Sequence, residues 1–342
     1  TFEYQGSGTS VAEYAFTFED EQTTVELSKA DLTDKKELPG ASLKVTDEDG
    51  NTVDEWVSKE EAHIIKGLIV GKKYKMTETK PADGYVTAES IEFTVENTKE
   101  VQKHQMLDDV TKVEISKKDI TDSSEVPGAK LIILDKDGKK VESWTSTDKP
   151  HMVEKLPVGE YTLREEQAPD GYLIAEDVKF TVKDTGKVQK VKMKDAHPYG
   201  KLVIKKTDST SKAALSGAEF ELREKESGKV VEKLVTDKTG TATSGKIPIA
   251  TYKNGKVEKT VEYILVETKA PNGYELSSKK EEIRFEYKDG KTKVIEIVKE
   301  IKNTKSPSGS TPTGNSPKTG DSTNIWLPIL LAVLSACGIG VI

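Results

Sequence analysis

Cysteine is almost missing from this sequence: the single cysteine among 342 residues, Cys337, lies in an uncharged run near the C-terminal end. The rest of the chain has no thiol, which excludes disulfides, thiolate zinc sites and cysteine nucleophiles there. A basic stripe with interleaved aromatic residues is also lacking, and acidic residues exceed basic ones by 59 to 52, so we expect no nucleic-acid partner. We interpret the net charge of −7 as a solubility feature.

Signatures of metal and cofactor sites are lacking too. The four histidines do not gather at metal-ligand spacing, and the chain has neither a phosphate loop nor a nucleophile elbow. Segments 47–50 and 135–138 begin like a calcium loop, but the later ligands do not follow, and we predict hairpin turns there. We therefore expect no metal, no cofactor and no enzyme activity on an external substrate.

The main feature that is present is a pattern repeated three times. A strand-like segment that ends in lysine occurs at 25–29, 113–117 and 202–206, at an interval of about 90 residues. A second segment, Tyr-x-x-x-Glu followed by Gly-Tyr, occurs at 74–85, 161–172 and 263–274. The third copy carries an insertion between its lysine and its tyrosine segment. We infer three modules.

Alternating short segments and turn signals predict the fold of each module. Turn signals such as Asp49-Gly50, Asp137-Gly138 and Asn254-Gly255 separate the alternating segments, and no convincing helical stretch appears before the C-terminal end. Several short strands in roughly 90 residues predict a two-sheet sandwich. We expect an all-β fold of tandem immunoglobulin-like sandwich modules, followed by a disordered linker and a C-terminal hydrophobic helix.

Each module turns three polar side chains toward its own core. Side chains alternate faces along a strand, so Lys29 must share the inward face of Val25 and Leu27. The same alternation turns a glutamate inward in the tyrosine segment, and an Asp or Asn inward in the last strand. The inward set is Lys29, Glu78 and Asp108 in module one, Lys117, Glu165 and Asp195 in module two, and Lys206, Glu267 and Asn303 in module three.

Charged groups in such places must pair, become neutral or react, because an isolated buried charge costs on the order of several kcal/mol. Burial lowers the pKa of a lysine and raises that of a carboxyl group, which produces a nucleophilic amine beside a protonated acid. The amine can then attack the Asp or Asn side-chain carbon while the glutamic acid polarises the carbonyl and moves protons. Ordinary solvated strand-end charges are the alternative, and recurrence in three modules speaks against it.

This pattern resembles the B-type repeat of the collagen adhesin Cna and of SpaA-like pilins, which is a prealbumin-like sandwich. The family's motif Tyr-x-Leu-x-Glu-x-x-Ala-Pro-x-Gly-Tyr is matched at 161–172 and 263–274, whereas 74–85 has Pro-Ala in place of Ala-Pro. The resemblance covers residues 23–304 and implies one internal amide bond per module. The implied bonds join Lys29 to Asp108, Lys117 to Asp195 and Lys206 to Asn303, with Glu78, Glu165 and Glu267 as assisting acids. Asp109 is a neighbouring alternative to Asp108, although register with Met106 favours Asp108.

The C-terminal segment resembles a sortase signal. Ser316-Pro317-Lys318-Thr319-Gly320 is similar to the motif Leu-Pro-x-Thr-Gly, with serine in place of the leucine. The resemblance implies that sortase cuts after Thr319 and joins its carboxyl group to peptidoglycan. The uncharged run 325–342 would extend about 27 Å as a helix, enough to span a bilayer core, but no basic tail follows it.

These features divide the chain into six parts. They are the last strand of a preceding module at 1–22, repeats at 23–110, 111–199 and 200–304, a Ser/Pro/Gly/Thr linker at 305–315, and a sorting signal with its hydrophobic segment at 316–342. No signal peptide is recognisable at the N-terminal end, so we expect the chain to be the C-terminal piece of a longer secreted protein.

The function that we expect is a structural stalk on the cell surface of a Gram-positive bacterium, covalently anchored to the wall. One alternative is an adhesin or minor pilin subunit whose modules bind a host matrix protein or glycan directly. Another is a polymerising pilin backbone, which needs a lysine in a motif of Trp, Val, Tyr, Pro and Lys. No such motif surrounds Trp56 or Trp144.

Overall fold

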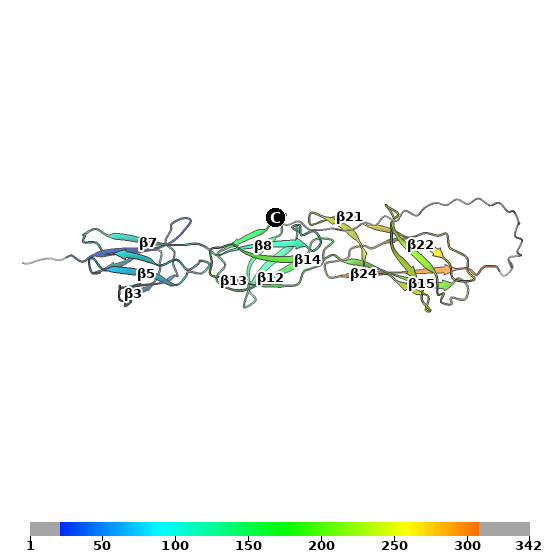
Figure 1. Cartoon of the computed structure of the whole chain (residues 1–342), viewed down its shortest axis with the longest axis horizontal. Helices are drawn as coiled ribbons and strands as arrows, with labels where there is room; N and C mark the ends of the chain where they lie inside the picture. The colour runs from blue at the N-terminus through cyan, green and yellow to red at the C-terminus, as the bar shows by residue number, and fades with distance from the viewer. Residues whose placement is uncertain (1–20, 308–342) are drawn as a thin grey trace, which may run out of the picture.

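The computed structural model describes residues 21–307. All regular secondary-structure elements of residues 21–307 are β-strands, which confirms the predicted all-β class. Figure 1 shows three modules in a row along the longest axis of the molecule. No segment of the described range forms a helix of the length and apolarity that a membrane crossing requires. The predicted hydrophobic helix at 325–342, the sorting signal and the strand expected before residue 21 lie outside the described residues.

Module one consists of a three-stranded and a four-stranded sheet. The smaller sheet has the order β4-β1-β7 and the larger one the order β3-β2-β5-β6. The strands are β1 (Thr24–Asp31), β2 (Ser42–Thr46), β3 (Thr52–Val57), β4 (His63–Lys66), β5 (Lys73–Lys80), β6 (Ile91–Thr94) and β7 (Gln102–Asp108). The first strand β1 and the last strand β7 run parallel as neighbours, although most of the module separates them in the sequence.

Module two repeats this arrangement. Its sheets have the orders β11-β8-β14 and β10-β9-β12-β13, again with the first strand parallel to the last. The strands are β8 (Lys112–Asp119), β9 (Lys130–Asp135), β10 (Lys140–Thr145), β11 (His151–Glu154), β12 (Gly159–Gln167), β13 (Val178–Val182) and β14 (Gln189–Asp195). The predicted hairpin turns at 47–50 and 135–138 are confirmed, since they connect β2 to β3 and β9 to β10.

Module three keeps the plan and adds the insertion. β15 lies between β18 and β24, with β19 beside its first residues, and the second sheet has the order β17-β16-β22-β23. The strands are β15 (Tyr199–Asp208), β16 (Glu219–Glu224), β17 (Val230–Val235), β18 (Thr241–Thr243), β19 (Ile247–Pro248), β20 (Ala250–Lys253), β21 (Lys256–Thr260), β22 (Glu262–Lys269), β23 (Glu281–Arg284) and β24 (Val294–Asn303). β18 holds the place beside β15 that β4 holds beside β1, so the insertion supplies the separate hairpin β20–β21.

Alternation along the strands produces one apolar core between the two sheets of each module. In module one, Val25 and Leu27 of β1 face Leu43 of β2 and Met76 of β5, and all four are almost completely buried. The indole ring of Trp56 in β3 stacks on the imidazole ring of His63 in β4, at 4.2 Å between ring centroids. Module two repeats this stack, so these aromatic residues pack at the edge of the sandwich.

Candidate functional site: three buried lysine–carboxyl clusters

The three lysines that end the repeated strand segments lie inside the modules, as the strand alternation predicts. Lys29, Lys117 and Lys206 are 1%, 2% and 0% exposed. Each follows two inward apolar residues on the first strand of its module, so continuing the alternation forces the lysine into the core. Full burial of an amine is unfavourable unless it has polar partners, so the groups around each Nζ atom define the site.

The first partner comes from the last strand of the same module. β7 runs parallel to β1 with Met106 opposite Lys29, so Asp108 lies two residues further along on the same inward face. The Lys29 amine donates a short hydrogen bond to Asp108 Oδ1. The equivalent amines contact the equivalent oxygens, in the pairs Lys117 with Asp195 and Lys206 with Asn303. The neighbouring alternative, Asp109, instead pairs with Lys112 at 2.8 Å near the surface.

The second partner comes from the opposite sheet. Glu78 in β5, Glu165 in β12 and Glu267 in β22 lie 2.9, 3.0 and 2.9 Å from the lysine Nζ atoms of their modules. Each glutamate is 4% exposed. One carboxylate oxygen accepts a backbone N–H bond from the following loop, at 2.7 Å from Ala88, 2.6 Å from Ala175 and 3.0 Å from Ser277. These bonds hold the carboxyl groups in place over the lysine.

Burial controls the protonation of each cluster. Loss of solvent raises the pKa of Asp108 and that of Asp195 to about 7, although the neighbouring lysine opposes the shift and the glutamate adds to it. Burial likewise lowers the pKa of Lys206, against the effect of Glu267. A protonated Asp108 or Asp195 is therefore accessible near neutral pH, and in module three the Lys206 amine loses its proton more readily than a solvated lysine does.

Hydrogen bonding indicates where a proton must lie. In module three, Asn303 Nδ2 donates to Glu267 Oε1 at 3.0 Å. In module two the equivalent atom is Asp195 Oδ2, and both it and Glu165 Oε1 are buried without a hydrogen-bond partner. One proton shared by the two carboxyl groups would replace the amide N–H of module three and satisfy both oxygens.

This geometry allows a condensation. Each lysine nitrogen touches the side-chain oxygen of its Asp or Asn, and a glutamate lies within hydrogen-bond distance of the amine. An amine, an acyl group and a carboxyl group held together in one buried site are the parts that acyl transfer requires. All nine residues that the sequence analysis placed in the sites come together in three clusters of the same geometry.

Comparison with known proteins now identifies the repeat. A profile of the SpaA prealbumin-like fold domain matches residues 23–109, 111–197 and 200–301. The chain belongs to the SpaA prealbumin-like domain family. No curated protein matches the chain significantly.

Solved structures are similar to this chain to different degrees. The TIE protein of Bacillus anthracis is 27% identical and covers 84% of this chain and 52% of its own, with a TM-score of 0.55. This chain therefore spans about half the length of that protein. BcpA, the major pilin subunit of Bacillus cereus, is 18% identical over 84% of this chain and 100% of its own, with a TM-score of 0.49. The major pilin SpaD of Corynebacterium diphtheriae is 18% identical over 85% and 99%, with a TM-score of 0.39.

The SpaA repeats of this chain also share a buried contact that the sequence analysis missed. The residue two positions after each lysine is an aspartate, namely Asp31, Asp119 and Asp208. The tyrosine of the Gly-Tyr motif donates its hydroxyl to this carboxylate at 2.7 Å in modules one and two. The repeated Lys-x-Asp spacing and the repeated Gly-Tyr were both visible in the sequence, but nothing in a single strand indicates that they meet.

The hydroxyl and backbone donors keep these aspartates ionised. Burial opposes ionisation of Asp119, but the Thr121 backbone and the Tyr172 hydroxyl outweigh it and lower its pKa to about 2. In module three, backbone N–H groups of the following turn and the Tyr274 hydroxyl lower the pKa of Asp208 to about 2. An aspartate that is ionised at neutral pH therefore ends the first strand of each SpaA repeat.

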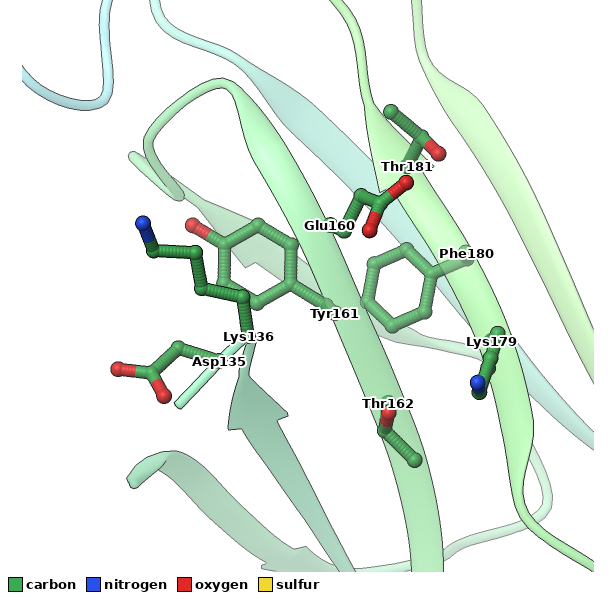
Figure 2. A pocket seen from close by; sticks show the side chains of 8 residues that line it. All are labelled: Asp135, Lys136, Glu160, Tyr161, Thr162, Lys179, Phe180 and Thr181. Carbon is green, nitrogen blue, oxygen red and sulfur yellow. The ribbon is translucent and has the colours of Figure 1, made fainter. Parts of the chain in front are cut away.

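A surface hollow on module two lies away from the cluster. Figure 2 shows this hollow of about 350 Å³, in which the Tyr161 and Phe180 rings lie side by side between charged side chains. It is lined by Asp135, Lys136, Glu160, Tyr161, Thr162, Lys179, Phe180 and Thr181. No cluster member is among these residues, and residues 21–307 contain no group of side chains arranged to hold a metal ion.

Proposed function

We propose that this chain is the stalk of a surface protein of a Gram-positive bacterium, and that each of its modules closes an internal amide bond. One observation carries the proposal: three times, a fully buried lysine touches an Asp or Asn on the last strand beneath a buried glutamate. Ordinary strand-end charges would lie in solvent. A buried ion pair is a weak source of stability, whereas a covalent bond at the same place is a strong one.

The reaction balances without a cofactor. The neutral lysine Nζ attacks Cγ of the Asp or Asn, and the glutamic acid donates a hydrogen bond to the oxygen that becomes negative. The glutamic acid then gives its own proton to the leaving group and takes up the amine proton, so it ends the reaction protonated as it began. Water leaves from Asp108 and Asp195, whereas ammonia leaves from Asn303. The product in all three modules is the same secondary amide.

The amide changes how a module bears tension. In module two, a pulling force enters at the start of β8 and leaves after the end of β14, and these strands are parallel neighbours. With Lys117 joined to Asp195, the force crosses the amide and bypasses residues 118–194. The module then cannot be unfolded by tension without breaking a covalent bond. This property suits a stalk that holds an outer region away from the cell wall.

Anchoring is the second half of the proposal. We infer from the similarity of residues 316–320 to the sortase motif that Thr319 is the residue joined to peptidoglycan. Expression of the chain with a secretion signal in a Gram-positive host should place it in the covalent wall fraction. Thr319→Ala should release it into the medium or leave it in the membrane. Wall attachment of this variant equal to that of the unsubstituted chain would refute the assignment.

Intact-mass measurement of the full chain tests the amides directly. The expected mass is lower than the sequence mass by two water molecules and one ammonia. Proteolysis should release branched peptides that join the lysine segment to the last strand of each module. A mass equal to the sequence mass would refute the proposal.

A further inference from the structure

The Gly-Tyr motif forms a corner of the same shape in every module. Gly84, Gly171 and Gly273 have positive φ angles of 85°, 88° and 79°. The tyrosine N–H that follows closes the turn onto the carbonyl three residues earlier, at 3.0 to 3.1 Å. The corner lies at the end of the module from which the chain continues, because backbone bonds join it to the residues after the last strand, such as Thr111 N to Gly84 O.

The corner of module one touches module two. A Cβ atom on Gly84 would lie 2.4 Å from the carbonyl oxygen of Lys155, which follows β11. The Lys155 amine donates to the Tyr85 hydroxyl at 2.6 Å and lies 3.3 Å from Asp31 Oδ2. The turn of module two at Lys155 therefore packs against Gly84, and the Lys155 amine joins the contact between Asp31 and Tyr85. Lys155 adopts a left-handed backbone conformation, with a φ of 62°.

The corner of module two touches the insertion of module three. A Cβ atom on Gly171 would lie 2.2 Å from a methyl group of Val257, in the hairpin β20–β21. The Tyr252 hydroxyl donates to Gly171 O at 2.8 Å, and its ring stacks on His197 at 3.4 Å between centroids. His197 Nε2 in turn lies 2.8 Å from Asp119 Oδ2, the aspartate that the corner tyrosine binds.

The hairpin also reaches past the corner. A Cβ atom on Gly255, at the hairpin tip, would lie 1.9 Å from the carbonyl oxygen of Glu125 in module two. By contrast, a Cβ atom on Gly273 would meet nothing within 4 Å in the part of the chain that the structure describes. The corner at Gly84 is thus covered by a turn of module two, and the corner at Gly171 by the hairpin of module three. The corner at Gly273 has the same backbone conformation, but nothing among residues 21–307 covers it.

We propose that the Gly-Tyr corners of modules one and two are docking surfaces for the modules that follow them, and that they hold neighbouring modules in one orientation. The partner that it fits is a tight turn or hairpin at the leading end of the next module, carrying a hydrogen-bond donor for the corner. In this proposal, the inserted hairpin of module three holds module three against module two. Domains in one chain ordinarily move relative to each other unless an interface restrains them, so these joints make the stalk a rod. The inference stands whether or not the amides form.

Three glycine substitutions separate docking from backbone strain. Gly84→Ala, Gly171→Ala and Gly273→Ala impose the same cost of a side chain at positive φ. Only the first two place a methyl group in the next module. Gly84→Ala should loosen the joint between modules one and two, Gly171→Ala the joint between modules two and three, and Gly273→Ala neither.

The measurement is the distribution of distances between spin labels on the full chain, in a Cys337→Ser background. Labels at Lys59→Cys, Lys149→Cys and Lys238→Cys place one probe on an exposed loop of each module. We expect narrow distributions for the unsubstituted glycines and a broadening of roughly twofold or more at the affected joint alone. Broad distributions before any glycine is changed would overturn the proposal, as would equal broadening in all three variants.

A side-chain variant guards against a failure to fold. Lys155→Ala removes the donor that module two gives to the corner of module one, from a side chain that is itself 53% exposed. It should broaden the distribution between modules one and two without altering the one between modules two and three. No broadening in Lys155→Ala, together with none in Gly84→Ala, would show that the contact does not orient the modules.

Discussion

Glu165→Gln is the sharpest perturbation of the proposed chemistry. Glutamine has nearly the same size and keeps a carbonyl oxygen at the position where Ala175 N donates its bond. It cannot carry a proton to or from the lysine or the leaving water. Lys117 and Asp195 should therefore remain an ion pair in module two, and the mass that the full chain loses relative to its own sequence should be smaller by one water molecule than in the unsubstituted chain.

The loss of the amide has a calculable effect on stability. The two residues are separated by 78 positions in the sequence. The chain-entropy relation for a cross-link that closes a loop of this size gives about 4.5 kcal/mol. For a module of this length, such a change lowers Tm by about 20 °C. The other two modules keep their amides, so calorimetry should show one transition moving down while the rest of the profile stays in place.

The matched control is Glu166→Gln, the next residue on β12, whose side chain is exposed. It should lose the same two water molecules and one ammonia relative to its own sequence mass and should keep the melting profile unchanged. If Glu165→Gln still loses two water molecules and one ammonia relative to its own sequence mass, Glu165 is not the acid that assists the reaction. If it loses one water molecule fewer but melts at the same temperature, the amide does not stabilise module two in the way that the loop argument requires.

Three further predictions concern force, the leaving group and pH. Under single-molecule tension the unsubstituted chain should release no length from module two, whereas Glu165→Gln should show one event of roughly 250 Å as residues 118–194 extend; an equal event in the unsubstituted chain would show that no amide bears the load. Asn303→Asp should mature to the same mass as the unsubstituted chain, because loss of water from Asp and of ammonia from Asn leave the same amide; a final mass higher by one water would show that module three requires the asparagine. Because the pKa values of Asp108 and Asp195 are raised to about 7, their reactive protonated forms disappear as pH rises through that value, so amide formation in modules one and two should slow between about pH 6 and about pH 8. In module three the acyl group, Asn303, does not titrate, and burial lowers the pKa of Lys206, so amide formation there should not slow over this range. The measurement is the time course of the mass loss after unreacted chain is refolded at each pH. Equal slowing in all three modules would contradict the argument.

The clusters could be predicted in large part because their members obey a local rule. Alternation along a strand depends on a few adjacent residues, so Val25 and Leu27 were enough to place Lys29 inside the module. The same rule placed Glu78 beside Met76 and Asp108 beside Met106. The recurrence of the inward Lys, Glu and Asp or Asn in all three modules then argued against a chance arrangement.

The joints between modules could not be predicted in this way. The corner tyrosine, Tyr172, belongs to a repeated motif, but neither its segment nor that of Tyr252 indicates that the two rings meet. Their contact depends on how the insertion of module three folds back against module two. The sequence shows the insertion only as extra length, because nothing in the inserted residues indicates that their hairpin packs against module two.

The sequence alone determined the strand pattern, the three repeats and which polar side chains must face inward, since these follow from local alternation and from self-similarity. Tertiary structure decided the rest. The parallel pairing of first and last strands set the offset that brings Asp108 rather than Asp109 to Lys29. Pairing across nearly a whole module depends on the packing of both sheets and the closure of every intervening loop, which no single segment encodes.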